Sequence, residues 1–144
     1  LVSGSYDNIV IIWDTINGSA KHILKQHLGQ IYSVAFSTDG KTVASSSYDG
    51  TIILWSVDEG KAIKTIELPP RVYANSLAYS PDGEILAAGS DDGAIYIWQV
   101  NNGNLLKKLE GHTNTTTSLA FTPDGKLLIS SSYDGTIRLW GITP

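Results

Sequence analysis

The sequence predicts an all-β repeat fold built from four-stranded antiparallel units. Three sets of markers recur in register along its 144 residues. Tryptophan returns at spacings of 42, 43 and 42 residues, at Trp13, Trp55, Trp98 and Trp140. An aspartate lies six residues before each of them, at Asp7, Asp49, Asp92 and Asp134. Asp-Gly turns at 39–40, 82–83 and 124–125 follow the same period. Because these markers share one period in the low forties, we predict a row of similar structural units.

The second unit shows how one period divides into strands. Residues 32–37 alternate in polarity and predict a first strand, followed by the turn at Asp39-Gly40. Residues 42–47 predict the second strand, and residues 51–56, rich in β-branched side chains and Trp, predict the third. Residues 62–67 complete the unit. Four short strands in a period of this length are typical of one β-propeller blade.

The strand count predicts about three and a half blades. The first strand expected is 1–6 and the last is 136–140, giving two complete blades flanked by two incomplete ones. We expect a single propeller segment over 1–144, with blades at 1–28, 29–68, 69–110 and 111–144. Propellers close with about four to eight blades. We therefore expect the remaining blades to come from a longer parent chain, or from self-association that closes a ring.

Composition argues against several classes of partner. The formal charge is −4, from 10 basic and 14 acidic residues. This does not favour nucleic acid, whose phosphates reward clustered Lys and Arg. The apolar runs are far shorter than the roughly 20 residues that span a bilayer, so no membrane partner is expected. The chain has no cysteine and no evident signal peptide. We expect a cytoplasmic protein without cofactor or metal.

The last unit carries the fullest set of recurring motifs. They are Gly111-His112, residues 118–121, Pro123-Asp124-Gly125, residues 130–132, Asp134-Gly135 and Trp140. This pattern resembles the WD-repeat β-propeller family, and the resemblance covers the whole chain. It implies a hydrogen-bonded set of His, Ser, Asp and Trp within a blade. Matching positions give two such sets, one of His27, Ser47, Asp49 and Trp55 and one of His112, Ser132, Asp134 and Trp140.

The third unit departs from the pattern. Pro69-Pro70 stand where Gly-His belongs, so Asp92 should lack a histidine partner. Since buried polar groups must be paired, we expect this unit to be the least rigid and its amide hydrogens to exchange first.

The resemblance also implies a partner-binding face, formed by the loops that join one unit to the next and the second strand to the third. Three positions per unit point there. They are Tyr6, Tyr48, Asp91 and Tyr133; then Tyr32, Asn75 and Thr117; then Gln30, Tyr73 and Thr115. Tyrosine is enriched at interfaces because it joins an apolar ring to a polar tip.

The expected function is a non-catalytic scaffold that binds a protein or peptide on this tyrosine-lined face, as part of a larger regulatory protein. A propeller that binds glycans or small molecules by stacking on the same tyrosines is the alternative. An enzyme is the remote alternative. The His, Ser and Asp of the repeated set resemble a catalytic triad, but they recur in successive units, whereas an active site needs one arrangement in one cleft.

Overall fold

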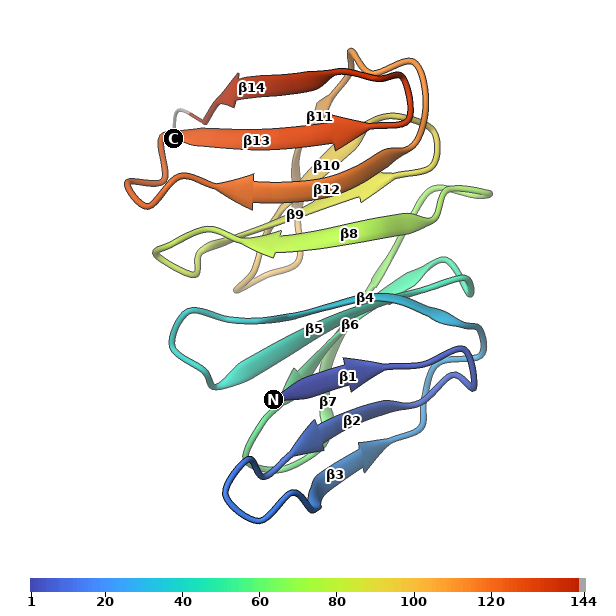
Figure 1. Cartoon of the computed structure of the whole chain (residues 1–144), viewed down its shortest axis with the longest axis vertical. Coiled ribbons are helices and arrows are strands. Elements are labelled where there is room, and N and C mark those ends of the chain that lie inside the picture. Colours follow the sequence, from blue (N-terminus) through green and yellow to red (C-terminus); the bar gives the residue numbers. More distant parts are fainter. Residues whose placement is uncertain (143–144) are drawn as a thin grey trace.

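Fourteen β-strands follow one another in the computed structural model, which describes residues 1–142 and shows no helix among them (Figure 1). None of these residues therefore forms a helix that could cross a membrane. The strands are β1 Val2–Gly4, β2 Val10–Trp13, β3 Ala20–Leu24, β4 Ile31–Phe36, β5 Thr42–Ser47, β6 Thr51–Ser56, β7 Ala62–Glu67, β8 Ala74–Tyr79, β9 Ile85–Ser90, β10 Ile95–Gln99, β11 Leu105–Leu109, β12 Thr116–Phe121, β13 Leu127–Ser132 and β14 Ile137–Gly141.

Consecutive strands pair antiparallel into four separate sheets. Strands β1–β3 form the first sheet, β4–β7 the second, β8–β11 the third and β12–β14 the fourth. This confirms the all-β prediction of two four-stranded units flanked by two three-stranded ones. The sheets form an open row in which the first and fourth lie at opposite ends, and β1, β4, β8 and β12 are the strands through which neighbouring sheets approach (Figure 1).

The central strands are apolar on both faces because a sheet packs against each side of them. In β6, Ile52 and Leu54 face the third sheet, while Ile53 and Trp55 face the first. All four are at most 2% exposed. A strand buried on both faces reads as a continuous apolar run, and this explains the Ile-Ile-Leu-Trp sequence. The core thus lies in three layers between sheets.

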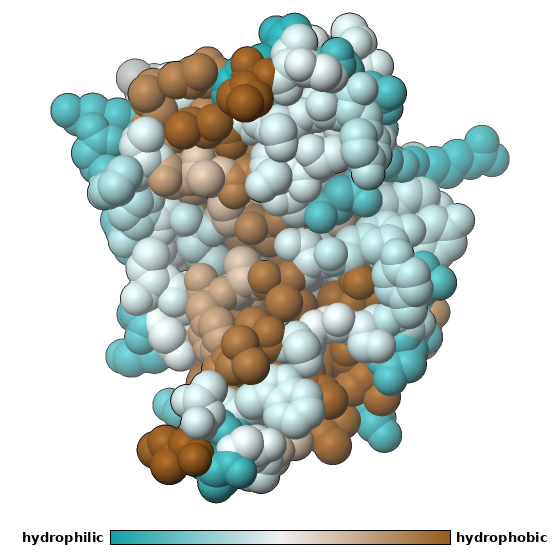
Figure 2. All heavy atoms as spheres, viewed as in Figure 1, coloured by the Kyte–Doolittle hydropathy of each residue, from teal (hydrophilic) through white to brown (hydrophobic). Residues whose placement is uncertain are grey.

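In the fourth sheet, the equivalent positions lie on a face against which no other sheet of the described chain packs. Ile137 and Leu139 of β14 match Ile52 and Leu54 in the repeat, yet they are 69% and 65% exposed. Figure 2 shows apolar residues at the surface at the top of the view, where β13 and β14 lie.

Tight turns join the strands at the end of the sheets away from the tyrosines. Gly40 adopts the positive φ of 70° that its turn requires. Asp39 fixes this turn by accepting hydrogen bonds from the Ser37 hydroxyl and the Lys41 N–H. These bonds hold the pKa of Asp39 below its usual range. The same arrangement returns at Asp82 and Asp124.

Candidate functional site

The loops at one end of the four sheets carry the residues predicted to bind a partner. We call this end the tyrosine face; it lies on the right in Figure 1. It consists of loops 5–9, 25–30, 48–50, 68–73, 91–94, 110–115 and 133–136, together with the first residues of β4, β8 and β12.

A β-bulge presents one residue of each innermost strand at this face. In β4 the pairing steps from Ile31–Ser47 to Ser33–Ser46, so Tyr32 is an extra residue with no partner in the ladder. Equivalent steps leave Asn75 extra in β8 and Thr117 extra in β12. Bulges re-aim side chains and increase local twist. All three predicted residues therefore owe their placement to the bulge.

Backbone hydrogen bonds join the two loops that meet at each sheet. The Tyr48 N–H donates to the Gln30 carbonyl at 2.9 Å. The Asp91 N–H donates to the Tyr73 carbonyl at 3.1 Å, and the Tyr133 N–H donates to the Thr115 carbonyl at 3.0 Å. The predicted residues of these loops are thus neighbours on a hydrogen-bonded frame.

Three tyrosines from the second sheet and the following loop form one cluster. The rings of Tyr48 and Tyr73 stack with centroids 4.5 Å apart and an angle of 22° between their planes. Tyr32 meets Tyr48 edge to face at 6.1 Å. We call these residues the tyrosine cluster. Tyr48 remains 53% exposed, so the cluster is ordered by its own contacts and still faces solvent.

The environment raises the pKa of two phenols of the cluster. Partial burial, followed by the neighbouring Tyr48, raises the pKa of both Tyr32 and Tyr73 above the usual value for tyrosine. The carboxylate of Asp91 acts in the same direction on both. Asp91 is held close because its Oδ1 accepts the Tyr73 N–H at 2.8 Å. It is the one carboxylate at a position where the other sheets have Tyr6, Tyr48 and Tyr133.

The remaining predicted residues lie on the same face outside the cluster. Tyr6 and Tyr133 are 71% and 75% exposed. The Asn75 amide donates to the Tyr73 carbonyl at 3.3 Å, and the Thr117 and Ser131 hydroxyls share a hydrogen bond of 3.0 Å. The sequence marked the face, but it did not reveal that only three of the tyrosines pack together.

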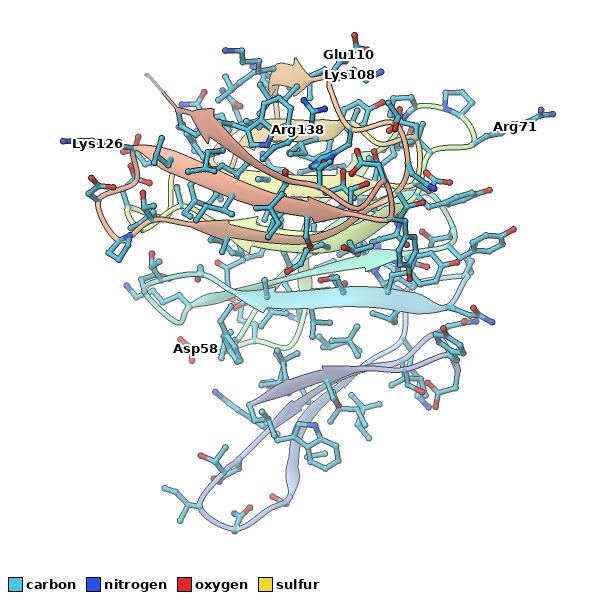
Figure 3. The ribbon with its side chains drawn as sticks, turned by 45° about the horizontal axis from the view of Figure 1, so that its top comes forward. Asp58, Arg71, Lys108, Glu110, Lys126 and Arg138 are labelled. Carbon is cyan, nitrogen blue, oxygen red and sulfur yellow. The ribbon has the colours of Figure 1, made fainter. Side chains whose placement is uncertain are left out.

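A cavity of about 330 Å³ borders the cluster. Its lining includes Tyr48 and Tyr73 together with Glu67, Pro70 and Arg71. Arg71 has a positive φ of 64°, uncommon for a residue with a side chain. Its side chain extends away from the body of the molecule on this side (Figure 3). Sequence analysis missed Arg71, although the neighbouring Pro69-Pro70 marked the loop as unlike its counterparts.

Two hydrogen-bonded chains lie beneath the tyrosine face. In the second sheet, His27 Nδ1 lies 2.8 Å from Asp49 Oδ2 and His27 Nε2 lies 2.8 Å from Ser45 Oγ. The Trp55 indole donates to the same Ser45 hydroxyl at 2.7 Å. Indole nitrogen can only donate, so Ser45 Oγ accepts from Trp55 and keeps its own proton to donate to a neutral His27 at Nε2. In this tautomer His27 carries its proton on Nδ1 and donates it to Asp49.

The fourth sheet repeats this chain with His112, Ser130, Asp134 and Trp140. The structure therefore corrects the serines predicted for both sets. Ser45 replaces Ser47, and Ser130 replaces Ser132. The Ser47 hydroxyl instead donates to the Gly29 carbonyl, and that of Ser132 donates to the Asn114 carbonyl, each at 2.8 Å. Those two serines secure the loops above the chain.

Both aspartates of these chains have a lowered pKa. For Asp49, burial pushes the pKa upward, but hydrogen bonds from Thr51, the Leu28 N–H and His27 outweigh it. For Asp134, the Thr136 hydroxyl is the largest cause of the lowering, and His112 and the Thr113 N–H add to it. Each aspartate therefore remains an anion that ties a loop to a strand.

In the third sheet, different residues form hydrogen bonds with the equivalent aspartate, Asp92. Ala88 pairs with Tyr96 where Ser45 pairs with Ile53, so the serine is absent together with the histidine. The Tyr96 hydroxyl donates to Asp92 Oδ2 at 2.9 Å, and its ring stacks on Trp98 with centroids 5.8 Å apart. Asp92 also accepts from Ser90 and from the Ala94 N–H. Asp92 has no histidine partner, as the sequence indicated, but it is not left unpaired, because the Tyr96 hydroxyl donates to it in the histidine's place.

The buried chains offer no reactive group to a substrate. Ser45 is fully buried and His27 is 5% exposed. Both His27 nitrogens, the Ser45 hydroxyl and the Trp55 indole already form hydrogen bonds within the set. Among residues 1–142, no three His, Asp or Glu side chains gather as a metal site would require. The chemistry open to solvent at this end includes tyrosine rings, hydroxyls and charged side chains such as Asp91 and Arg71.

Comparison with known proteins places three segments of the chain in one family. Residues 18–56, 61–99 and 103–141 match the profile described as WD domain, G-beta repeat. Each segment ends at the residue that follows one of the recurring tryptophans.

Individual relatives match shorter stretches. Cell division control protein 4 of Candida albicans is 34% identical over 67 residues, which are 46% of this chain and 10% of that protein. Small ribosomal subunit protein RACK1y of Oryza sativa is 33% identical over 67 residues, 46% of this chain and 20% of that protein. Human F-box-like/WD repeat-containing protein TBL1Y is 49% identical over 41 residues, 28% of this chain and 8% of that protein. The matched stretch spans at most a fifth of each of these relatives.

Proposed function

Because this chain belongs to the WD domain, G-beta repeat family, we propose that it is a non-catalytic interaction module whose tyrosine cluster binds a segment of a partner protein. The observation that carries the proposal is the contact of Tyr32, Tyr48 and Tyr73 on an exposed face. Rings that already pack on one another lose little conformational freedom when a partner arrives, and such preorganisation favours binding.

The supports of the cluster favour the same role. Tyr32 stands on a bulge of β4, and Tyr73 is held by Asp91. The His27 chain fixes the loop that precedes β4. Sites on rigid supports bind with better defined geometry than sites on loose loops. The cavity beside Tyr48 and Tyr73 provides a recess next to the rings. A nucleic-acid or membrane partner is not proposed, since the chain's formal charge is −4.

Selection from a random-peptide display library tests this proposal. Peptides that bind the chain should lose about tenfold or more in affinity on Tyr48→Ala, as expected when one central aromatic contact is removed. Tyr133→Ala is the matched control, because it occupies the same loop position outside the cluster and should cost at most about threefold. Equal affinity for the parent chain and Tyr48→Ala would refute the role of the cluster.

Glycan binding is the second candidate, since tyrosine recurs at one loop position of three sheets in Tyr6, Tyr48 and Tyr133. Sugars stacked on these rings would occupy one site per sheet. Binding to an oligosaccharide array that declines stepwise as each tyrosine is replaced, without any selected peptide, would favour this candidate over the first.

A further inference from the structure

We propose that the tyrosine cluster receives a cationic side chain, arginine or lysine, from the partner segment, with Asp91 as its counter-ion. This inference rests on the proposed function and names the chemistry of the ligand. The observation that carries it is the Asp91 carboxylate, bonded to the Tyr73 N–H, beside a cluster of three tyrosine rings on an exposed face. Ring faces attract cations through their quadrupole, and a nearby carboxylate adds direct attraction.

Asp91 is an exposed carboxylate of the tyrosine face. Its Oδ1 accepts the Tyr73 N–H at 2.8 Å. No ion pair involves Asp91 among residues 1–142, whereas Lys108 lies 3.6 Å from the adjacent Asp92 and 3.0 Å from Glu110. Lys108 and Glu110 lie together at the top of Figure 3. Lys108, the basic side chain of the neighbouring strand β11, is thus paired with other carboxylates.

The electrostatic field of the surrounding loops also favours binding of a cation. The loops of the tyrosine face carry six carboxylates and two basic side chains; they are Asp7, Asp49, Asp91, Asp92, Glu110 and Asp134, with Lys25 and Arg71. Lys108 of β11 pairs with two of these carboxylates, and the face still carries more acidic than basic groups. Arg71 borders the cavity, but its side chain extends outward in Figure 3. Charge complementarity raises association rates and selects among partners.

The form of the cluster decides how the cation would bind. Tyr48 and Tyr73 are stacked at 4.5 Å, which leaves no space for a side chain between them. The cation must therefore lie over an outer ring face, beside Asp91. A planar guanidinium can stack on such a face and still donate to the carboxylate. We therefore expect arginine to bind better than lysine.

Titration with N-acetylated arginine amide, followed by amide and side-chain NMR shifts, tests the inference without knowledge of the partner. The glutamine and glutamate amides serve as neutral and anionic counterparts. Resonances of Tyr32, Tyr48, Tyr73 and Asp91 should move with the arginine probe. Asp91→Asn should weaken the arginine probe about fivefold, since Asn still accepts the Tyr73 N–H and only the charge is lost. Glu84→Gln, an equal charge change on the opposite end, should have little effect.

A second pair of variants separates the ring from its hydroxyl. Tyr48→Phe should retain the arginine probe, because the ring face remains, and Tyr48→Leu should weaken it about threefold or more. Stronger shifts with the glutamate probe, equal shifts with all three probes, or none at the cluster would each overturn the cationic ligand. The proposed function would still stand if selected peptides bound at Tyr48 without a basic residue, so the two failures are distinguishable.

Discussion

Replacement of Tyr96 by Phe isolates the hydrogen bond that lets the third sheet dispense with its histidine. The substitution removes the hydroxyl that lies 2.9 Å from Asp92 Oδ2. It keeps the ring that stacks on Trp98 and lies 5.4 Å from Lys108 Nζ. Packing is therefore nearly unchanged, and the loss in stability reports on one hydrogen bond.

The expected magnitude follows from the charge and the exposure of the acceptor. Hydrogen bonds to charged groups contribute about 1.5–3 kcal/mol. The Asp92 side chain is 30% exposed and has other donors in Ser90 and the Ala94 N–H. Water and these donors compensate in part, so we expect Tyr96→Phe to lower the free energy of unfolding by about 1–2 kcal/mol.

Urea unfolding followed by tryptophan fluorescence measures this loss, and Tyr79→Phe supplies its control. The Tyr79 hydroxyl is buried and has no hydrogen-bond partner among the described residues. Its removal should leave stability unchanged or slightly raised, because a buried unpaired polar group is unfavourable. Equal losses for the two variants would refute the assignment of Tyr96 as the replacement for histidine.

The pH dependence of the Tyr96→Phe variant gives a second test. Burial pushes the pKa of Asp92 upward, but bonds from Ser90, Ala94 and Tyr96 and the charge of Lys108 leave it lowered. A group with a lowered folded pKa stabilises fully above its unfolded pKa of about 3.9 and loses this effect as pH falls through the folded value. The difference between the parent chain and the variant should therefore be complete near pH 7 and shrink below about pH 4.

Three further outcomes are expected. Ser45→Ala should lower stability by about 1–3 kcal/mol and shift the indole N–H resonance of Trp55, because the Trp55 acceptor is lost; an unmoved resonance would contradict the bond. Leu54→Ala should cost about 2–5 kcal/mol and Leu139→Ala less than about 1 kcal/mol in urea unfolding, since only the first is buried in the described chain; similar costs would speak against the sheet order. The parent chain should lose stability below about pH 4 in an acid titration, because the pKa of Asp49 is lowered in the folded state. Asp49→Asn should make this loss smaller. An unchanged acid profile would contradict the contribution of Asp49.

Sequence predicted the fold well because its markers are local. Each turn glycine and each run of β-branched residues specifies a strand end or a strand without reference to distant residues. The repeat then multiplies the signal four times. The predicted strand ends differ from the observed ones by at most two residues, as in the strand expected at 1–6 and found at Val2–Gly4.

The hydrogen-bonded chains were less predictable because alternation cannot separate residues two positions apart. Ser45 and Ser47 point to the same face of β5. Only the strand register, which pairs Ser45 with Ile53 two residues before Trp55, decides which hydroxyl the indole reaches. The role of Tyr96 was hidden for a related reason. It is recognisable only when the losses of histidine at Pro70 and of serine at Ala88 are considered together.

The tyrosine cluster lies beyond sequence reasoning in another way. The family pattern indicated a face, but the bulge at Tyr32 and the orientation of loop 68–73 determine which rings meet. These depend on packing between sheets. Tyr6 and Tyr133 share the sequence context of Tyr48 and still remain separate and more exposed.

Mapping a selected peptide onto the chain by NMR tests the binding role of the tyrosine cluster most directly. The account predicts that the largest amide shifts on titration fall at Tyr32, Tyr48, Tyr73 and Asp91. The glycines of the opposite turns, Gly40 and Gly83, should stay unmoved. Shifts concentrated at those turns, with the cluster silent, would contradict it.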